Sequence, residues 1–142
     1  MKNTTELPSD YASLLSTVSS RGILSEDISA IDNRLIYAMQ GVSSTIKSDD
    51  LGIADWATQT LKTVKRKIHE EICDPKTKKL KKLYDDVFSH ALSQDSIKNI
   101  SAFIAPLVAA INPGLAVSSI LIFLAIWLLK IGANAWCATT PA

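Results

Sequence analysis

NPGLAVSSILIFLAIWLLKIGANAW, residues 112–136, decides the fold because, wound into a helix, it is apolar on nearly every side. No ionisable side chain occurs between Asn99 and Leu129. A helix without a polar face is either the buried centre of a bundle or a membrane span. Asparagine at 112 suits a helix N-cap and proline at 113 suits the first helical turn, so we expect a new helix to begin there.

A second apolar segment, residues 97–111, precedes this helix. Its apolar residues recur at steps of three and four, and the other positions hold alanine, serine, asparagine and Pro106 instead of charges. We therefore expect two helical arms, residues 97–111 and 113–136. Together they form a hydrophobic hairpin within a C-terminal unit of residues 95–142.

Residues 1–94 have the hydrophobic spacing and caps of an amphipathic helical body. We expect its helices, in chain order, between Ser9 and Gly22, from Ser25 to about residue 46, from the acidic cap at 48–50 to Asp74, and over 77–92. No segment has the alternation typical of a strand. The fold class is therefore all-α, with about four amphipathic helices followed by a C-terminal hydrophobic helical hairpin. The narrow apolar stripe over residues 28–46 also allows self-association.

The net charge of +1 conceals a basic segment. Residues 62–82 hold nine basic and three acidic side chains. Such a block can contact anionic lipid, and a solvated turn between helices is the alternative. Nucleic acid is disfavoured because the segment lacks interleaved aromatic residues. The residues expected to contact an anionic surface are Lys76, Lys78, Lys79, Lys81 and Lys82.

The apolar arm has just the length for a bilayer, because Pro113 to Leu129 gives 17 residues before Lys130 and spans need roughly 17 to 25. Lys130 can extend to the interface. The positive-inside rule then keeps the helical body cytoplasmic and places the C-terminal segment in the membrane, the alternative being a fully cytosolic protein. The residues expected to insert are Leu115, Val117, Ile120, Leu121, Ile122, Phe123, Leu124, Ile126, Trp127, Leu128, Leu129 and Trp136.

No stretch of the sequence has a catalytic signature. His69 and Cys73, four residues apart on one helix, and Asp86 and His90, four apart on the next, are the candidates for a zinc site. Such pairs arise easily by chance, so we expect no metal, no other cofactor and no enzymatic activity. Two cysteines without a secretory signal indicate free thiols and an intracellular protein.

The general plan, an amphipathic helical body with a hydrophobic helical hairpin, resembles those of colicin-type pore-forming domains and Bcl-2-like proteins in pattern, without a shared motif. The expected function is that of a small non-enzymatic protein bound to membrane lipid through its C-terminal apolar helix, as a membrane-inserting or membrane-disrupting effector. The alternative is a soluble all-helical protein-interaction module with the apolar helix as its buried core. Its protein partner, or a second copy, would then bind the stripe of residues 28–46.

Overall fold

The computed structural model describes residues 7–46, 53–73 and 93–131, and every regular element within them is helical. This confirms the all-α class. The helix expected over 77–92 lies outside the described residues. In chain order the elements are α1 (Tyr11–Ser20), the 3-10 turn η1 (Ile23–Ser25), α2 (Ile28–Ile46), α3 (Ile53–Ile72), α5 (Gln94–Ile111), the 3-10 turn η3 (Pro113–Leu115) and α6 (Ser118–Ile131).

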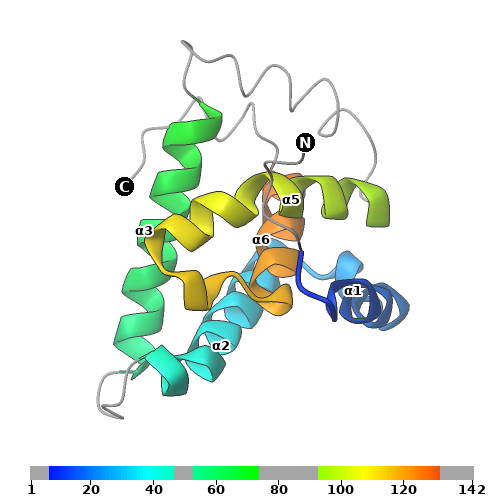
Figure 1. Cartoon of the computed structure of the whole chain (residues 1–142). Helices are drawn as coiled ribbons and strands as arrows, with labels where there is room; N and C mark the ends of the chain where they lie inside the picture. Colours follow the sequence, from blue (N-terminus) through cyan, green and yellow to red (C-terminus); the bar gives the residue numbers. More distant parts are fainter. Residues whose placement is uncertain (1–6, 47–52, 74–92, 132–142) are drawn as a thin grey trace.

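The apolar helix α6 lies at the centre of the bundle (Figure 1). Helices α1, α2 and α5 pack against it, and α3 packs against α2 and α5. Every residue from 120 to 128 is buried, because α6 offers an apolar side chain at each of these positions and its neighbours cover all sides. Within 7–46, 53–73 and 93–131, no helix combines the length and hydropathy needed to cross a bilayer.

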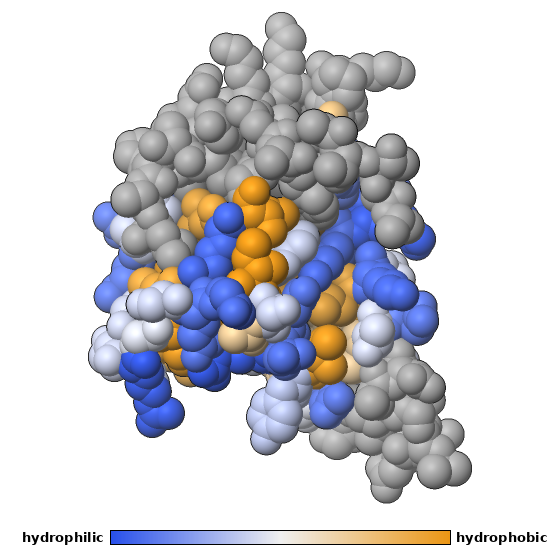
Figure 2. All heavy atoms as spheres, turned by 180° about the vertical axis from the view of Figure 1, so that it is seen from behind, coloured by the Kyte–Doolittle hydropathy of each residue, from blue (hydrophilic) through white to orange (hydrophobic). Residues whose placement is uncertain are grey.

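The amphipathic helices turn their expected stripes toward this centre. In α1 the buried residues are Tyr11, Leu15 and Val18, as their spacing predicts. Ile31, Leu35 and Met39 of α2 are completely buried, whereas Ile28, at the first position of the helix, remains 39% exposed. Polar side chains fill the opposite faces. On the side of the molecule shown in Figure 2, hydrophobic residues lie in separate patches among hydrophilic ones.

Helix α2 begins later than the sequence indicated. Ser25, expected to open it, ends the 3-10 turn η1 instead. The turn follows Gly22, whose φ of 74° lies in the left-handed region that favours glycine. Asp27 then caps α2, because its carboxylate accepts a 2.8 Å hydrogen bond from the backbone N–H of Ala30.

The turn before α6 also differs from the prediction in detail. Asn112 ends α5 and its side chain accepts a 3.0 Å hydrogen bond from the N–H of Gly114, so it caps as expected. The turn that it caps is η3 rather than the long helix. Ala116, with ψ of 55°, leaves the helical conformation, and α6 begins only at Ser118.

Candidate functional site: the groove between α2 and α6

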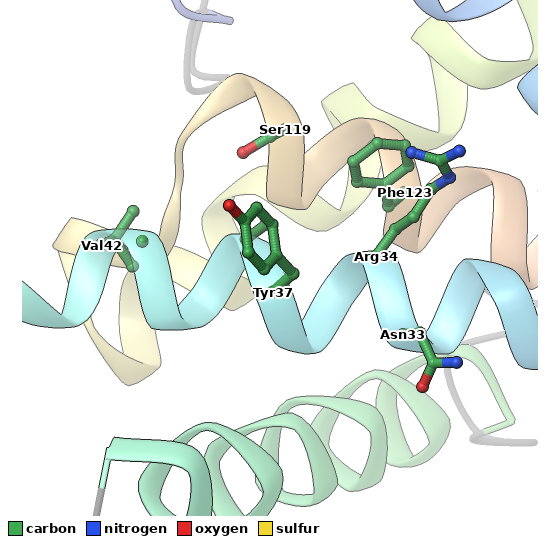
Figure 3. A pocket seen from close by; sticks show the side chains of 8 residues that line it. Asn33, Arg34, Tyr37, Val42, Ser119 and Phe123 are labelled. Carbon is green, nitrogen blue, oxygen red and sulfur yellow. The ribbon is translucent and has the colours of Figure 1, made fainter.

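A groove with a volume of about 550 Å³ runs between α2 and α6. The buried stripe of α2 faces α6, and residues beside that stripe form one wall of the groove. The side chains of Arg34 and Tyr37 rise from α2 on the same side as Ser119 and Phe123 of α6 (Figure 3). The lining residues are Asn33, Arg34, Tyr37, Ala38, Gly41, Val42, Ser119 and Phe123.

Tyr37 is the most unusual residue of the groove because 78% of it is exposed. Its neighbours on the stripe, Leu35 and Met39, are completely buried, so the helix turns Tyr37 outward. A tyrosine combines a large apolar ring with a hydroxyl that can donate or accept a hydrogen bond. Exposed aromatic residues of this kind are enriched among those that dominate binding energy at protein interfaces.

Arg34 carries the groove's single basic charge, and Glu26 neutralises it. The guanidinium Nε and Nη2 atoms each donate a 2.6 Å hydrogen bond to the Glu26 carboxylate. These hydrogen bonds hold the pKa of Glu26 below its ordinary value, the positive charges of Arg34 and Lys130 lower it further, and the pair raises the pKa of Arg34. The groove is therefore close to neutral overall.

Gly41 lines the groove one helical turn beyond Tyr37 and has no side chain to fill it. A Cβ atom built at Gly41 would meet no atom within 4 Å apart from those of its own helix backbone and chain neighbours. Tyr37 and Gly41 lie side by side on α2, because residues four apart are neighbours on a helix surface.

Buried hydrogen bonds fix α6, and with it the second wall of the groove. The Tyr11 hydroxyl donates to the hydroxyl of Ser101 at 2.5 Å, and Ser101 donates in turn to the carbonyl oxygen of Leu121 at 3.3 Å. At the start of α6, the Ser118 hydroxyl donates to the Asp10 carboxylate at 2.5 Å. Hydrogen bonds have direction, which apolar packing lacks, so these contacts define how α6 is rotated.

Lys65 joins α3 to both helices of the groove. Its ammonium group lies 2.6 Å from a carboxylate oxygen of Asp32 on α2 and 4.1 Å from the ring centroid of Trp127 on α6. A cation over an indole face is attracted by the ring's negative face. Lys65, counted in the basic segment by its sequence position, thus has an internal structural contact.

The structure places most of the residues expected to insert into lipid in the protein core. Val117 and Leu129 are half-buried, and Trp136 lies outside the described residues. The lysines expected to meet an anionic surface, Lys76, Lys78, Lys79, Lys81 and Lys82, also lie outside them. The buried members of the set are Leu115, Ile120, Leu121, Ile122, Phe123, Leu124, Ile126, Trp127 and Leu128.

One of the four metal-ligand candidates, Cys73, forms a disulfide bond and is therefore unsuited to bind zinc as a thiolate. Cys73 is disulfide-bonded, so the prediction of a free thiol is wrong and this sulfur is no thiolate ligand. Cysteine spacing in a sequence does not reveal which side chains the fold brings together. His69 is buried near the end of α3, whereas Asp86 and His90 lie outside the described ranges. The part of the chain that the structure describes contains no group of three candidate ligands.

The apolar stripe of α2, on which the sequence placed a protein partner or a second copy, is buried in the core at Ile31, Leu35 and Met39 and offers these residues to no partner. The sequence analysis gave no role to Tyr37 or Gly41. The sequence feature that could have drawn attention to them is that both lie off the apolar stripe, four residues apart. Tyr37 has a large aromatic side chain, and Gly41 has no side chain. The sequence alone does not show that α6 lies beside them. Comparisons with protein-family models, curated proteins and solved structures found no match to this chain.

Proposed function

We propose that this protein is a non-enzymatic protein-interaction module whose α2–α6 groove receives apolar side chains of a partner. The single observation that carries the proposal is Tyr37, 78% exposed on the rim of a neutral groove. Phe123, 9% exposed, supplies an apolar surface inside it. Because most side chains of α6 are buried, the helix is held firmly in place and can form a rigid wall of the groove.

The dimensions of the groove suit side chains of a helix or extended peptide. Its volume of about 550 Å³ lies within the roughly 300 to 1,000 Å³ typical of binding pockets. Apolar residues of a partner would contact Phe123 and Val42, while the Tyr37 hydroxyl and Ser119 offer hydrogen bonds at the edge. This arrangement corresponds to recognition of an amphipathic helix by a hydrophobic groove.

Panning the full-length protein against a displayed library of random peptides tests the proposal. We expect selected peptides with aromatic or aliphatic residues at helical spacing, and Gly41→Trp should weaken their binding at least about tenfold by placing a large ring in the groove that Gly41 lines. Gln59→Trp, at an exposed position of α3, is the matched control and should leave binding unchanged. Failure to select any peptide, or equal binding by Gly41→Trp, would contradict the proposal.

Membrane association through the C-terminal apolar hairpin is a second candidate function, favoured by the all-round apolar character of α6. The 14 described residues of α6 reach about 21 Å at 1.5 Å per residue, against roughly 30 Å of hydrocarbon. Six of its isoleucine and leucine side chains are 0% exposed. Exposing them costs about 9 to 18 kcal/mol in total, comparable with the whole stability of a domain. Insertion therefore requires the bundle to open and lipid to replace its core.

Cell fractionation with a high-pH carbonate wash separates the two candidates. A membrane-inserted chain stays in the pellet, and Lys130→Leu retains it there because the substitution removes a charge from the apolar segment. An interaction module stays in the supernatant. Recovery of wild type and Lys130→Leu in the supernatant, monodisperse without detergent, would eliminate the membrane candidate.

A further inference from the structure

We infer that the outer face of α3 binds an anionic lipid surface by contacting its charged headgroups while the helical bundle stays closed. This goes beyond the proposed function, because it uses a different helix from the two that form the groove. Helix α3 lies along one side of the bundle, packed against α2 and α5 (Figure 1). Lys62, Arg66 and Lys67 carry the inference, and we call them the basic face of α3.

The core determines which side of α3 meets water. The buried apolar residues of the helix recur at steps of three and four, and they are Ala57, Leu61, Val64 and Ile68. Lys62 and Arg66 lie on the opposite side, one turn apart, and both are exposed. Lys67 follows Arg66 and is half-buried. Because packing fixes the rotation of α3, the three cations are presented together on its outer side.

The cations of this face have no acidic partner among the described residues. The two ion pairs within the described ranges engage Arg34 and Lys65 instead. Glu70 is the exposed acid of the same helix row, one turn after Arg66, and the two side chains form no ion pair. With Glu70 included, the three cations leave a net charge of +2 on the outer side of α3. This positive charge is therefore available to an external anion.

The positive charge continues in the sequence after the helix. Helix α3 ends at Ile72, and five lysines follow between residues 76 and 82. Clusters of about four to eight basic residues on an amphipathic helix are typical of proteins that bind anionic lipids electrostatically. The basic face of α3 is thus the first part of a basic segment with the composition of such proteins.

The row of charges favours a lipid surface over nucleic acid. Duplex DNA carries one negative charge per about 1.7 Å of its axis, so phosphates that contact Lys62 and Arg66 would also lie against Glu70 and repel it. Anionic lipids diffuse sideways among neutral ones, so they can gather under the cations while neutral lipid lies beneath Glu70. In the described part of α3, the exposed side chains also include no aromatic ring on which a base could stack.

Co-sedimentation of the full-length protein with phosphatidylcholine vesicles, prepared with and without phosphatidylserine, tests the inference. At low ionic strength we expect binding only to the vesicles that contain phosphatidylserine. The double variant Lys62→Gln/Arg66→Gln should lower the partition coefficient at least about tenfold, because each basic residue near such a surface contributes roughly fivefold. Both substitutions are at exposed positions, and far-UV circular dichroism verifies that the variant is folded.

The matched control is Arg21→Gln/Lys98→Gln, which removes the same charge from exposed positions at the end of α1 and on α5. Helix α1 lies across the molecule from α3 (Figure 1). The control should therefore keep most of the wild-type binding. Equal losses in the two double variants would show that net charge, rather than the basic face of α3, determines binding, and would overturn the inference.

Lysine acetylation with a water-soluble reagent maps the contact on the wild-type chain. Peptide mass spectrometry should show slower reaction of Lys62 and Lys67 when vesicles containing phosphatidylserine are present, and an unchanged rate at Lys98. Equal protection of all three lysines, or protection of none, would overturn the inference.

Three further results would each overturn it. They are equal or absent binding to neutral and anionic vesicles, stronger binding to a DNA duplex than to anionic vesicles at the same ionic strength, and binding to anionic vesicles that high salt does not release. The last result would indicate insertion of the apolar helix instead, because salt screens contacts between exposed charges. None of these results depends on the α2–α6 groove, so the proposed function is tested separately.

Discussion

The phenol of Tyr11 donates a 2.5 Å hydrogen bond to the hydroxyl of Ser101, although 90 positions separate the two residues in sequence. Ser101 is completely buried and donates onward to the carbonyl oxygen of Leu121. The chain of hydrogen bonds crosses from α1 through α5 to α6. It gives the largely apolar core a preferred arrangement, because each of the three helices contributes one group to the chain of hydrogen bonds and these groups must lie within hydrogen-bonding distance.

Tyr11→Phe should lower the free energy of unfolding by about 1 kcal/mol, because it removes a buried hydrogen bond and leaves the ring in place. Ser101→Ala should have a similar effect, since the Tyr11 hydroxyl then keeps only its 3.3 Å hydrogen bond to the carbonyl oxygen of Ile97. Urea unfolding of both variants and the double variant measures the coupling. Purely additive effects would show that the two hydroxyls do not act together.

Stability should also fall in alkaline solution through Tyr11. Burial raises the pKa of Tyr11 above its ordinary value of 10.0, and the hydrogen bond with Ser101 only partly offsets this. The folded state therefore retains a proton that the unfolded state has released. The stabilisation is complete below pH 10 and disappears as the pH rises through the higher folded-state pKa. Unfolding of wild type and Tyr11→Phe above pH 10 should reveal the difference, which an identical pH dependence would disprove.

Lys65→Met should destabilise the packing of α3 by about 1 kcal/mol, because it loses the Asp32 ion pair and the contact with the Trp127 ring. It should also change tryptophan fluorescence. Lys62→Met, at an exposed position one turn earlier on α3, is the matched control. Equal thermal unfolding of the two variants would show that the Lys65 contacts contribute nothing.

Two glycines should respond oppositely to alanine. Gly41→Ala should stabilise the protein by about 0.5 to 1 kcal/mol, because alanine favours the helix and its Cβ meets no other atom. Gly22→Ala should destabilise it by about 1 to 2 kcal/mol, since alanine disfavours a φ of 74°. Chemical denaturation of both variants measures the signs. Effects of the same sign would contradict this account of the two backbones.

Alkylation of the unfolded, unreduced protein should leave Cys73 unmodified, because its sulfur is disulfide-bonded. Peptide mass spectrometry then identifies its partner, and Cys137 is the one other cysteine of the sequence. Cys73→Ser should lower stability by about 2 to 4 kcal/mol through the freer unfolded chain. A Cys73 that reacts without prior reduction would refute the bond.

Hydrophobic periodicity is sufficient to locate the amphipathic helices of the described residues, and the uninterrupted apolar run locates α6. The stripe of Ile31, Leu35 and Met39 and the cap at Asn112 are local features, and the structure retains them. Helix starts were less accurate, because Ser25 and Pro113, at which helices were expected to begin, occupy 3-10 turns whose hydrogen bonds resemble a helix's first turn.

The groove was not readable from the sequence because its two walls come from distant segments. Tyr37 and Ser119 are separated by 82 positions, and nothing in either segment indicates the other. The environment of α6 was equally undecided, since a helix that is apolar on all sides satisfies lipid and protein core alike. The packing of α1, α2 and α5 around α6 places this helix in a protein core, and such long-range contacts are not visible in the local sequence.

The central position of α6 has a consequence for the order of events on the ribosome. Among the described elements it is synthesised after α1, α2, α3 and α5, all of which precede it in chain order. The apolar stripes of the earlier helices therefore remain exposed to water until α6, which fills the centre of the bundle, has been synthesised. Because exposed hydrophobic surface promotes aggregation, we expect these early helices to associate with chaperones until translation delivers the core.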